Sequence, residues 1–326
     1  MRFFVLNGAE ALGASTAAAL RHAPDPHEER DFEGGEHKAR PLTSVRGEDV
    51  FVLHDLVGDR RSSVNDRLIR LLFFLATCRD NGAARLTAVV PCLAYGRKDR
   101  QTKARDPVTT RYVAQLFEVM GTDRVITLDA HNIAAFQNAF RCETVHLDTR
   151  RLFVPAIRHL AANRPVTILS PDGGGIKLAQ LLKAVLETET DLAIGFGLME
   201  KRRSRGVVSG NLFAGAVEGT VVFIIDDMIV SGGTILRAAK ACVERGAAAV
   251  HVLAAHGMFN DMAGSLFADN AIDRITVTDS TAAAARAKAA FPDARLDIIG
   301  VGGLIGQAIL RLRSKESITD LLGAPG

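Results

Sequence analysis

The sequence predicts an α/β protein with two doubly wound parallel-sheet domains, and three observations support this fold class. Short apolar runs alternate with helical patterns along the whole chain. Most of these runs are almost continuously apolar, which is typical of parallel strands that helices cover on both faces. The length of 326 residues suits two domains of ordinary size. Together these features favour an alternation of strands and helices in each half of the chain.

Four strands are expected in the first half of the chain, at residues 3–6, 49–56, 86–93 and 124–130. The helical patterns between these strands are strongest at residues 63–82 and 106–121. The second pattern has a start signal in Asp106-Pro107 and a stop signal in Gly121. The first half therefore contains the alternation that a doubly wound sheet requires.

Six more strands are expected in the second half, at residues 166–172, 192–197, 221–227, 249–257, 274–280 and 296–302. A polar bend at residues 140–150 separates the halves, so the expected domains are 1–146 and 147–326. Polar excursions from the core are expected at residues 22–48, 97–107 and 200–211. In α/β sheets, ligands bind at the carboxyl ends of strands, and the candidate residues fall there or in these excursions.

Composition narrows the classes of function. The net charge of +3 is too small to indicate nucleic-acid binding. No apolar run approaches the ~20 residues that a membrane span needs, and the first residues indicate a strand rather than a signal peptide. Four widely spaced cysteines without a Cys-x-x-Cys pair argue against a metal cluster or a disulfide framework. A reduced cytoplasmic setting fits these features best.

The stretch FIIDDMIVSGGT, residues 223–234, carries the most specific chemistry. An apolar strand leads to Asp226 and Asp227, and a glycine turn from Ser231 to Thr234 then opens a helix. Backbone N–H groups at such a turn bind anions, whereas ionised carboxylates accept hydrogen bonds from hydroxyls or bind a metal. A lone acidic pair would indicate only a solvated strand end. With the glycine turn attached, the pattern favours a sugar phosphate as ligand.

This motif resembles the phosphoribosyl-diphosphate signature of type I phosphoribosyltransferases. Other stretches narrow the resemblance to the ribose-phosphate pyrophosphokinase family over nearly the whole chain. They include DFEGGEHKARPLTSVRGEDVFVL, SVNDRLIRLL, AVVPCLAYGRKDRQTKARDPVTTRYVAQLFE, RVITLDAHNIAAFQNAF, ILSPDGGG and EKRR. The resemblance implies two phosphoribosyltransferase-like domains. It also implies transfer of the β,γ-diphosphoryl group of ATP to the C1 hydroxyl of ribose 5-phosphate.

The resemblance implies a role for each matching residue. The residues expected to bind ribose 5-phosphate are Asp226, Asp227, Ser231, Gly232, Gly233 and Thr234. Those expected to bind ATP are Phe32, Glu36, Arg97, Lys98 and His131. Mg²⁺ is the expected cofactor, with His131 and Asp172 at the metal. Lys201 and Arg203 match the catalytic pair of the family's mobile loop, whose donors would act on the transferring group.

Each of these residues also has an ordinary structural interpretation. Asp172 is placed to cap a helix, and this role is compatible with a metal role. His131 alone would be a histidine at a strand end, and the basic stretches alone would be solvated charge runs. The sequence departs from the family at three positions: Gly34 and Val230 stand where aspartate is usual, and Lys98 where glutamine is common.

Two alternatives to an active diphosphokinase remain open at the level of sequence. The three departures motivate a catalytically weak regulatory subunit. The glycine-turn motif alone also fits a type I phosphoribosyltransferase, although that reaction does not need the stretches around Arg97 and His131. The segment containing Phe32 and Glu36 serves a neighbouring subunit in the family. A homo-oligomer of at least two subunits is therefore expected, with a hexamer as an open alternative and no nucleic-acid or membrane partner.

Overall fold

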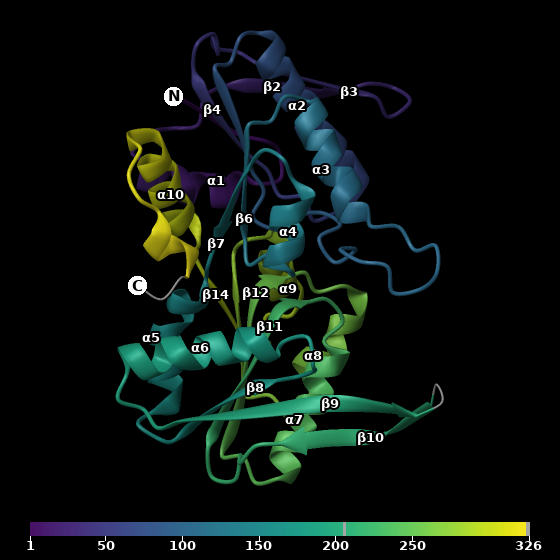
Figure 1. Cartoon of the computed structure of the whole chain (residues 1–326), viewed down its shortest axis with the longest axis vertical. Helices are drawn as coiled ribbons and strands as arrows, with labels where there is room; N and C mark the ends of the chain where they lie inside the picture. Colours follow the sequence, from purple (N-terminus) through teal and green to yellow (C-terminus); the bar gives the residue numbers. More distant parts are fainter. Residues whose placement is uncertain (205–206, 324–326) are drawn as a thin grey trace. The chain divides into compact units, whose positions relative to one another are not determined.

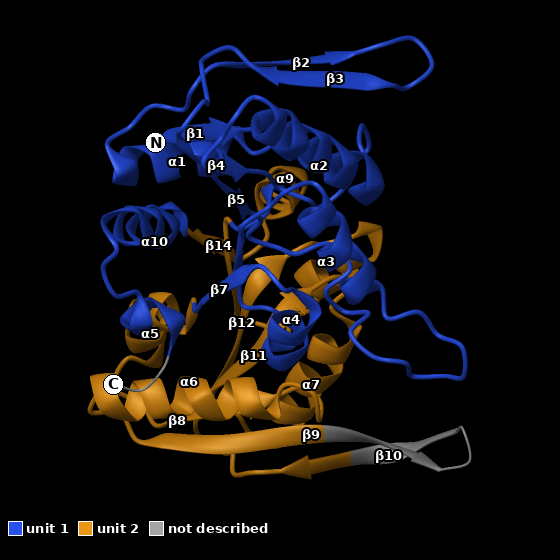
Figure 2. Cartoon of the chain, turned by 45° about the horizontal axis from the view of Figure 1, so that its top comes forward, with its two compact units in different colours: residues 1–148, 280–282, 300–326 blue, residues 149–279, 283–299 orange. Residues whose placement is uncertain are grey.

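The computed structural model describes residues 1–204 and 207–323, apart from the side chains of residues 200–211. The chain forms two compact units, which Figure 2 shows in different colours. Unit 1 contains Met1–Asp148, Ser280–Ala282 and Gly300–Gly326, and unit 2 contains Thr149–Asp279 and Ala283–Ile299. The chain thus returns to unit 1 after its last strand. No described helix has the length and apolar character needed to cross a membrane.

Unit 1 is built on a five-stranded, wholly parallel sheet with the strand order β1-β4-β5-β6-β7 (Figure 1). Its strands are β1 (Arg2–Val5), β4 (Asp49–Leu53), β5 (Arg85–Val89), β6 (Arg124–Leu128) and β7 (Glu143–Leu147). Its helices are α1 (Glu10–Leu20), α2 (Val64–Asp80), α3 (Thr109–Val119), α4 (Ile133–Ala139) and α10 (Gly302–Ser314), followed by the 3₁₀ turn η2 (Thr319–Leu322). Helical crossovers allow successive strands to run parallel.

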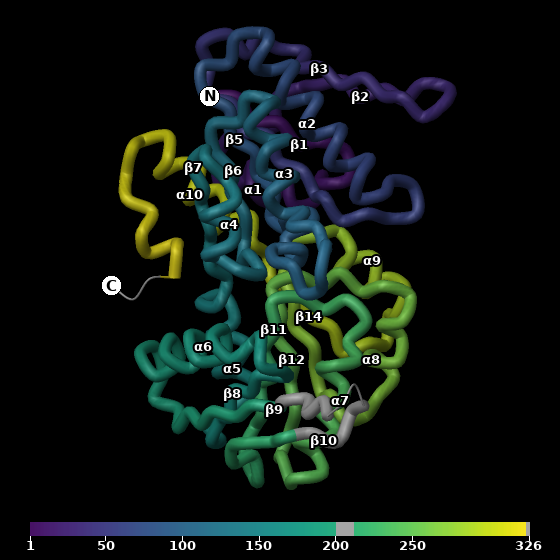
Figure 3. Tube along the Cα trace, turned by 45° about the vertical axis from the view of Figure 1, so that its right-hand side comes forward, coloured from purple at the N-terminus to yellow at the C-terminus, as the bar shows by residue number. Residues whose placement is uncertain are grey.

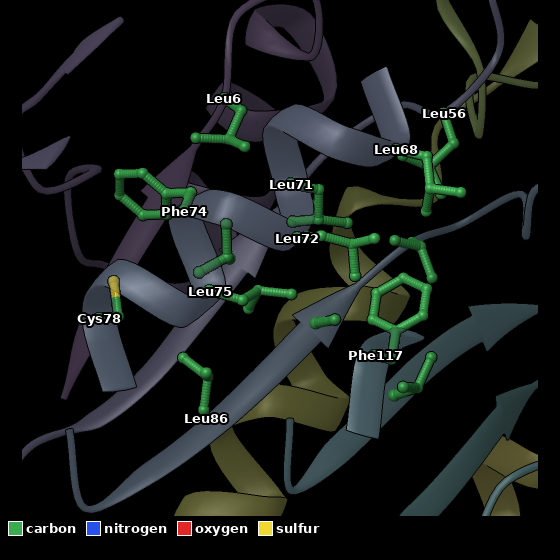
Figure 4. Close-up of a cluster of buried hydrophobic side chains, with 14 of the residues drawn as sticks. Leu6, Leu56, Leu68, Leu71, Leu72, Phe74, Leu75, Cys78, Leu86 and Phe117 are labelled. Atoms are coloured by element: carbon green, nitrogen blue, oxygen red, sulfur yellow. The ribbon is translucent and has the colours of Figure 1, made fainter. Parts of the chain in front are cut away.

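The core of unit 1 lies between this sheet and helix α2. Leu71, Leu75 and Cys78 follow the spacing of one helix face, and all three are fully buried. Figure 4 shows these side chains in the cluster that also contains Phe117 of α3. The helix begins at a capping box in which the Ser63 hydroxyl accepts from the Asp66 N–H group at 3.2 Å. Local pattern and packing therefore agree on the position of α2.

A two-stranded antiparallel hairpin, β2 (His27–Asp31) and β3 (His37–Pro41), extends from unit 1 (Figures 1 and 2). Its base is attached to the unit by Glu29, which accepts hydrogen bonds from the backbone N–H group of Asn7 and from His27. The turn contains Gly34 and Gly35, with φ angles of 93° and 91°, which glycine adopts without a Cβ penalty. The segment expected to be a polar excursion is therefore an ordered hairpin.

Unit 2 contains a seven-stranded sheet with the order β10-β9-β8-β11-β12-β13-β14, in which only the β9–β10 pair is antiparallel among the described pairs. Its strands are β8 (Val166–Ser170), β9 (Ile194–Ser204), β10 (Val207–Ala214), β11 (Val221–Ile229), β12 (Ala249–Gly257), β13 (Arg274–Thr278) and β14 (Leu296–Ile299). The remaining helices are α5 (Arg150–Ala161), α6 (Ile176–Glu189), α7 (Gly233–Glu244), η1 (Asp261–Ala263), α8 (Gly264–Ala268) and α9 (Ala282–Ala290).

The structure confirms the predicted fold class and contains a strand at each of the ten expected positions. The expectation of a polar bend at residues 140–150 is wrong, because β7 occupies the middle of this stretch. Val145 and Leu147 are buried at the edge of the sheet, although the polar residues around them hide the pattern. Helix α3 begins at Thr109 rather than at Asp106-Pro107. The Asp106 carboxylate instead accepts hydrogen bonds from residues 102 and 103.

Candidate active site

The acidic pair lies near the carboxyl end of β11, in the middle of the unit 2 sheet. Residues 221–225 of this strand are buried, whereas Asp226 and Asp227 are half-buried. On one side, pairing with β8 ends at Ile224, so the acids lie just beyond the last pair. On the other side, pairing with β12 continues to Ile229. Strand β11 is therefore longer than expected, and its acids are held on a backbone that remains part of the sheet.

Burial and the neighbouring charge favour a proton on one of the two carboxylates, Asp226. Burial, followed by the charge of Asp227, raises the pKa of Asp226 to about 8, and Asp172 contributes in the same direction. The backbone N–H group of Asp227 donates to the Asp226 carboxyl at 2.9 Å. A proton on Asp226 thus removes one negative charge and relieves the repulsion between the two adjacent carboxylates. A ligand that supplies hydroxyl donors or positive charge would replace this proton.

The residues from Ser231 to Thr234 form the phosphate loop, which begins helix α7. Gly232 is the N-cap residue with φ 74°, a left-handed conformation that favours glycine. A Cβ atom at this position would lie 2.7 Å from the Leu266 side chain, so space also requires glycine. The first N–H groups of a helix have no partner within the helix. The loop therefore has the geometry of an anion site at a helix N-terminus.

Asp172 follows β8, the neighbouring strand, and stabilises the turn into α6. Its carboxylate accepts hydrogen bonds from the N–H groups of Gly174 and Gly175, at 2.8 and 3.3 Å. A Cβ atom on Gly175 would lie 2.8 Å from the Ser170 hydroxyl, so this turn packs closely. The side chain of Asp172 is exposed, and its charge acts on Asp226. Unit 2 thus brings three carboxylates and the phosphate loop to one edge of its sheet.

The oxygen-rich character of this edge suits a divalent cation. Hard cations such as Mg²⁺ prefer carboxylate, phosphate and water oxygens, and Mg²⁺ often takes only one or two protein ligands. Among the described residues, no three His, Cys, Asp or Glu side chains form a ready-made metal cluster. The residues present therefore fit a cation whose remaining ligands are substrate oxygens and water.

In unit 1, two loops carry the predicted ATP residues. Arg97 and Lys98 follow β5, and His131 follows β6, the adjacent strand of the sheet. All three side chains are exposed. The two loops are connected by Asn132, whose amide donates to the Asp99 carboxylate at 2.7 Å. The structure therefore brings the Arg97–Lys98 pair and His131 to one edge of the unit 1 sheet.

Asp99 is a residue that the sequence analysis missed. Its charge looked like part of a solvated run, and its partner lies 33 positions further along the chain. Both loops also leave their strands through strained backbone, because Tyr95 and Asp129 have φ angles of 61° and 33°. Such conformations persist only where surrounding contacts hold them. No local pattern in the sequence identified this pair.

Phe32 and Glu36 lie at the tip of the β2–β3 hairpin. The Phe32 N–H group donates to the Glu36 carbonyl at 2.8 Å, and 42% of the Phe32 side chain is exposed. The Arg30 guanidinium lies over the Phe32 ring at 5.1 Å. Figures 1, 2 and 3 agree that this tip lies apart from the loop between β5 and α3 within unit 1. The structure therefore separates the predicted ATP residues into two groups.

Two predicted positions lie outside what the structure describes. Lys201 and Arg203 fall in the stretch 200–211, whose side chains are not among the described residues. A cavity of about 190 Å³ in unit 2 lies elsewhere and contains none of the predicted residues. Its lining includes Leu266, Arg274 and Arg295. Each unit therefore carries its own described group of candidate residues, around Asp226 in unit 2 and around Arg97 in unit 1.

Comparisons with known proteins give a consistent result. A family model described as the N-terminal domain of ribose phosphate pyrophosphokinase matches residues 1–121, and one described as the phosphoribosyl synthetase-associated domain matches residues 210–323. Ribose-phosphate pyrophosphokinase of Granulibacter bethesdensis is 34% identical over 322 residues, which cover 98% of this chain and 99% of that protein. Ribose-phosphate pyrophosphokinase A of Dictyostelium discoideum is 32% identical over 290 residues, covering 89% of this chain and 87% of that protein.

A solved structure supports the same relationship. The crystal structure of phosphoribosylpyrophosphate synthetase from Mycobacterium smegmatis matches with a TM-score of 0.84 and 27% sequence identity, covering 96% of this chain and 99% of that chain. Fold and site together define an α/β enzyme that handles phosphorylated substrates. Sequence identity to the two pyrophosphokinases over nearly the full length specifies the family within this class of enzymes. The chain belongs to the ribose-phosphate pyrophosphokinase family, as the sequence motifs indicated.

Proposed function

We propose that this chain transfers the β,γ-diphosphoryl group of ATP to the C1 hydroxyl of ribose 5-phosphate. The C1 oxygen forms a bond to the β-phosphorus, and the bond from that phosphorus to the α,β-bridging oxygen breaks. AMP leaves with the bridging oxygen, the hydroxyl proton passes to solvent, and phosphoribosyl pyrophosphate is formed. The observation that carries this proposal is the continuous strand, turn and helix from Asp226 to Thr234 in a chain that matches the family throughout.

Ribose 5-phosphate binds at the unit 2 edge in this proposal. The N–H groups of the phosphate loop bind the 5-phosphate, which is a dianion near neutral pH, at the positive end of α7. Asp226 and Asp227 accept hydrogen bonds from the ribose hydroxyls. The half-burial of these acids supports the assignment, because removal of water strengthens each hydrogen bond they make.

ATP binds through the unit 1 loops. The planar donors of Arg97 suit phosphate oxygens, and Lys98 adds a second positive charge beside them. The connection between Asp99 and Asn132 supports a joint role for these residues and His131. Phe32 and Glu36 contact the adenine base bound by a neighbouring subunit. Gly34 supplies no side-chain acceptor for the adenine amine, so base recognition depends on other groups.

Members of this family are ATP-using enzymes, which is consistent with a requirement for a divalent metal. We assign Mg²⁺ to this role, with Asp172 and His131 at the metal. When bound, the cation neutralises negative charge on the phosphate oxygens. Lys201 and Arg203 then act on the transferring group, where positive donors are most effective as charge develops.

The proposal extends to domains, assembly and location. The expected domain 1–146 carries ATP and the expected domain 147–326 carries ribose 5-phosphate, although residues 300–326 belong to the compact unit that contains the first. The separation of the hairpin tip from the other ATP residues supports an oligomer of at least two subunits, with a hexamer as one possible assembly. A reduced cytoplasmic setting is consistent with the buried thiols of Cys78 and Cys242, since burial raises the pKa of both to about 12.

A product assay tests the reaction directly. The purified chain is incubated with ATP, ribose 5-phosphate and Mg²⁺, and AMP and phosphoribosyl pyrophosphate are quantified. Both products are expected in equal amounts, and neither without ribose 5-phosphate. The Asp227→Asn variant is expected to lose activity, whereas Asp261→Asn, at a surface position beyond β12, retains it. Nucleotide binding without AMP formation would instead support a regulatory subunit. Repeating the assay with other triphosphates tests base recognition.

A further inference from the structure

The residues that follow β12 attach the start of the phosphate loop to the rest of unit 2. Residues 257–260 are named the brace segment. The N–H groups of Met258 and Phe259 both donate to the Ile229 carbonyl, at 2.9 and 3.1 Å. The N–H group of Asn260 donates to the Val230 carbonyl at 3.0 Å. One short segment therefore fixes both peptide groups that lead from β11 into the phosphate loop.

Phe259 has an unusual conformation within the brace segment. Its φ angle is 37°, in the left-handed region, which is costly for a bulky side chain and persists only where contacts hold it. Its ring lies over the end of β12, because a Cβ atom on Gly257 would be 2.6 Å from the ring. The same ring packs against Phe267, with 5.1 Å between centroids. Contacts on two sides thus hold the strained backbone.

Two further features direct the brace segment toward the loop. The pairing of β12 with β13 shifts register between Ala254 and His256, which marks a β-bulge at Ala255. The Thr278 hydroxyl donates to the Ala255 carbonyl at 2.6 Å and fixes this bulge. Bulges bend a strand and often occur beside functional sites. The end of β12 is therefore redirected immediately before the brace segment begins.

The chain continues from the brace segment through η1 into α8, and this helix also packs against the phosphate loop. The Leu266 side chain lies close to Gly232, so a Cβ atom at position 232, 2.7 Å from its terminal methyl group, would displace it. Val230, which stands where the family usually has aspartate, offers no carboxylate to stabilise the loop. Its backbone carbonyl is instead bonded to Asn260. Support for the loop thus comes from the hydrogen bonds of residues 258–260 and from the packing of Leu266.

We propose that Phe259 is a positioning residue for the ribose 5-phosphate subsite. Its anchored ring holds the left-handed backbone at position 259. This backbone points the N–H groups of residues 258–260 at the carbonyl groups of Ile229 and Val230. The resulting hydrogen bonds set the direction of the phosphate loop. This inference rests on the proposed function only for the identity of the loop's ligand. It predicts that the ring at position 259 controls the affinity for the sugar phosphate without touching it.

The test compares Phe259→Ala with Phe291→Ala, which also removes an aromatic ring. Phe259→Ala is expected to raise the KM for ribose 5-phosphate about tenfold, as for the loss of one well-placed interaction. The KM for ATP is expected to stay unchanged. Phe259→Tyr keeps the ring contacts and is expected to retain the wild-type KM. Phe291→Ala is the control, because Phe291 packs on Phe267 at 5.1 Å but lies outside the brace segment. Its KM for ribose 5-phosphate is expected to remain as in wild type.

Direct calorimetric titration with ribose 5-phosphate separates this inference from the proposed reaction. If the wild type binds the sugar phosphate but forms no AMP, the proposed reaction fails, and weaker binding by Phe259→Ala still supports the positioning role. Equal binding by Phe259→Ala and the wild type would overturn the inference, as would equal weakening by Phe291→Ala. Should Phe259→Ala not fold, Phe259→Leu serves in its place, with the same expected direction and the same overturning result.

Discussion

Asp226 combines burial, a charged neighbour and a position at a strand end. Because its pKa is raised to about 8, the native state holds a proton that the unfolded chain releases above pH about 4. The native state therefore binds more protons than the unfolded state across this window, and stability falls as pH rises through it. A cation bound nearby would favour release of this proton, because an opposite charge lowers the pKa of a carboxyl group.

Asp226→Asn tests this titration. We expect the wild type to lose stability relative to the variant between pH about 4 and about 8, the unfolded and folded pKa values of Asp226, because the amide has no proton to release. Thermal unfolding of both proteins at several pH values measures the difference. Asp261→Asn, which changes an exposed aspartate, serves as the control and should follow the wild type. A pH-independent difference between Asp226→Asn and the wild type would contradict the raised pKa.

Lys201 is expected to act on the transferring group rather than on nucleotide binding. Lys201→Ala should lower kcat by about 100- to 1000-fold, as for the loss of a single donor to developing charge. The affinity for ATP should change little, since the interaction forms mainly in the transition state. Steady-state kinetics and nucleotide titration measure the two effects. Lys288→Ala, at an exposed position of α9, is the control. Unchanged turnover in Lys201→Ala would remove its catalytic role.

At the scale of elements, the junction of β11 and α7 fixes the position of the loop that we propose binds phosphate. Parallel pairing with β8 and β12 fixes the strand, and the glycine turn then starts the helix. The two elements meet at Gly232, whose conformation and surroundings both exclude a side chain. The turn is therefore rigid because of tertiary packing as well as local sequence.

Gly232→Ala measures the requirement for this turn. The added methyl group meets Leu266, and the left-handed conformation is disfavoured for alanine. We expect a loss of at least about 1 kcal/mol in the free energy of unfolding, together with a higher KM for ribose 5-phosphate. Chemical denaturation and kinetics provide the two values. Gly303→Ala is the matched control, because a Cβ atom there meets no atom within 4 Å. If both variants have equal stability, the turn does not require glycine.

At the scale of the whole molecule, the predicted ATP residues lie on two separate parts of unit 1. The hairpin tip carries Phe32 and Glu36, whereas Arg97 and His131 lie at the carboxyl edge of the sheet. In the proposed ATP site, the hairpin of one subunit and the loops of another supply the two groups. If this proposal holds, activity depends on the assembly rather than on one chain.

Subunit complementation tests the shared site. Phe32→Ala and Arg97→Ala should each have low activity alone, because every site in such an assembly lacks one residue. After the two variants are mixed and allowed to exchange subunits, some sites receive an intact hairpin from one chain and an intact loop from the other. Activity should therefore increase on mixing. No increase after exchange, verified with differently tagged chains, would indicate that the hairpin acts within its own chain.

Local patterns predicted most of the fold. Continuous apolar runs identified the ten expected strands, since burial on both faces leaves a clear signature in sequence. Strand β7 was missed because its buried apolar residues, Val145 and Leu147, are separated by the polar His146 and preceded by Glu143 and Thr144. Only its place at the sheet edge, beside β6, makes that short stretch a strand. The hairpin was missed as an element for the same reason, as its residues are mostly polar.

The sequence by itself determined the order of the ten expected strands and the run from Asp226 to Thr234, because both depend on neighbours along the chain. The tertiary structure alone decided the link from Asp99 to Asn132 and the bonds from the brace segment to Ile229 and Val230. These contacts join residues about thirty positions apart. They form because parallel pairing places the ends of β5 and β6, and of β11 and β12, side by side. No local pattern encodes that adjacency.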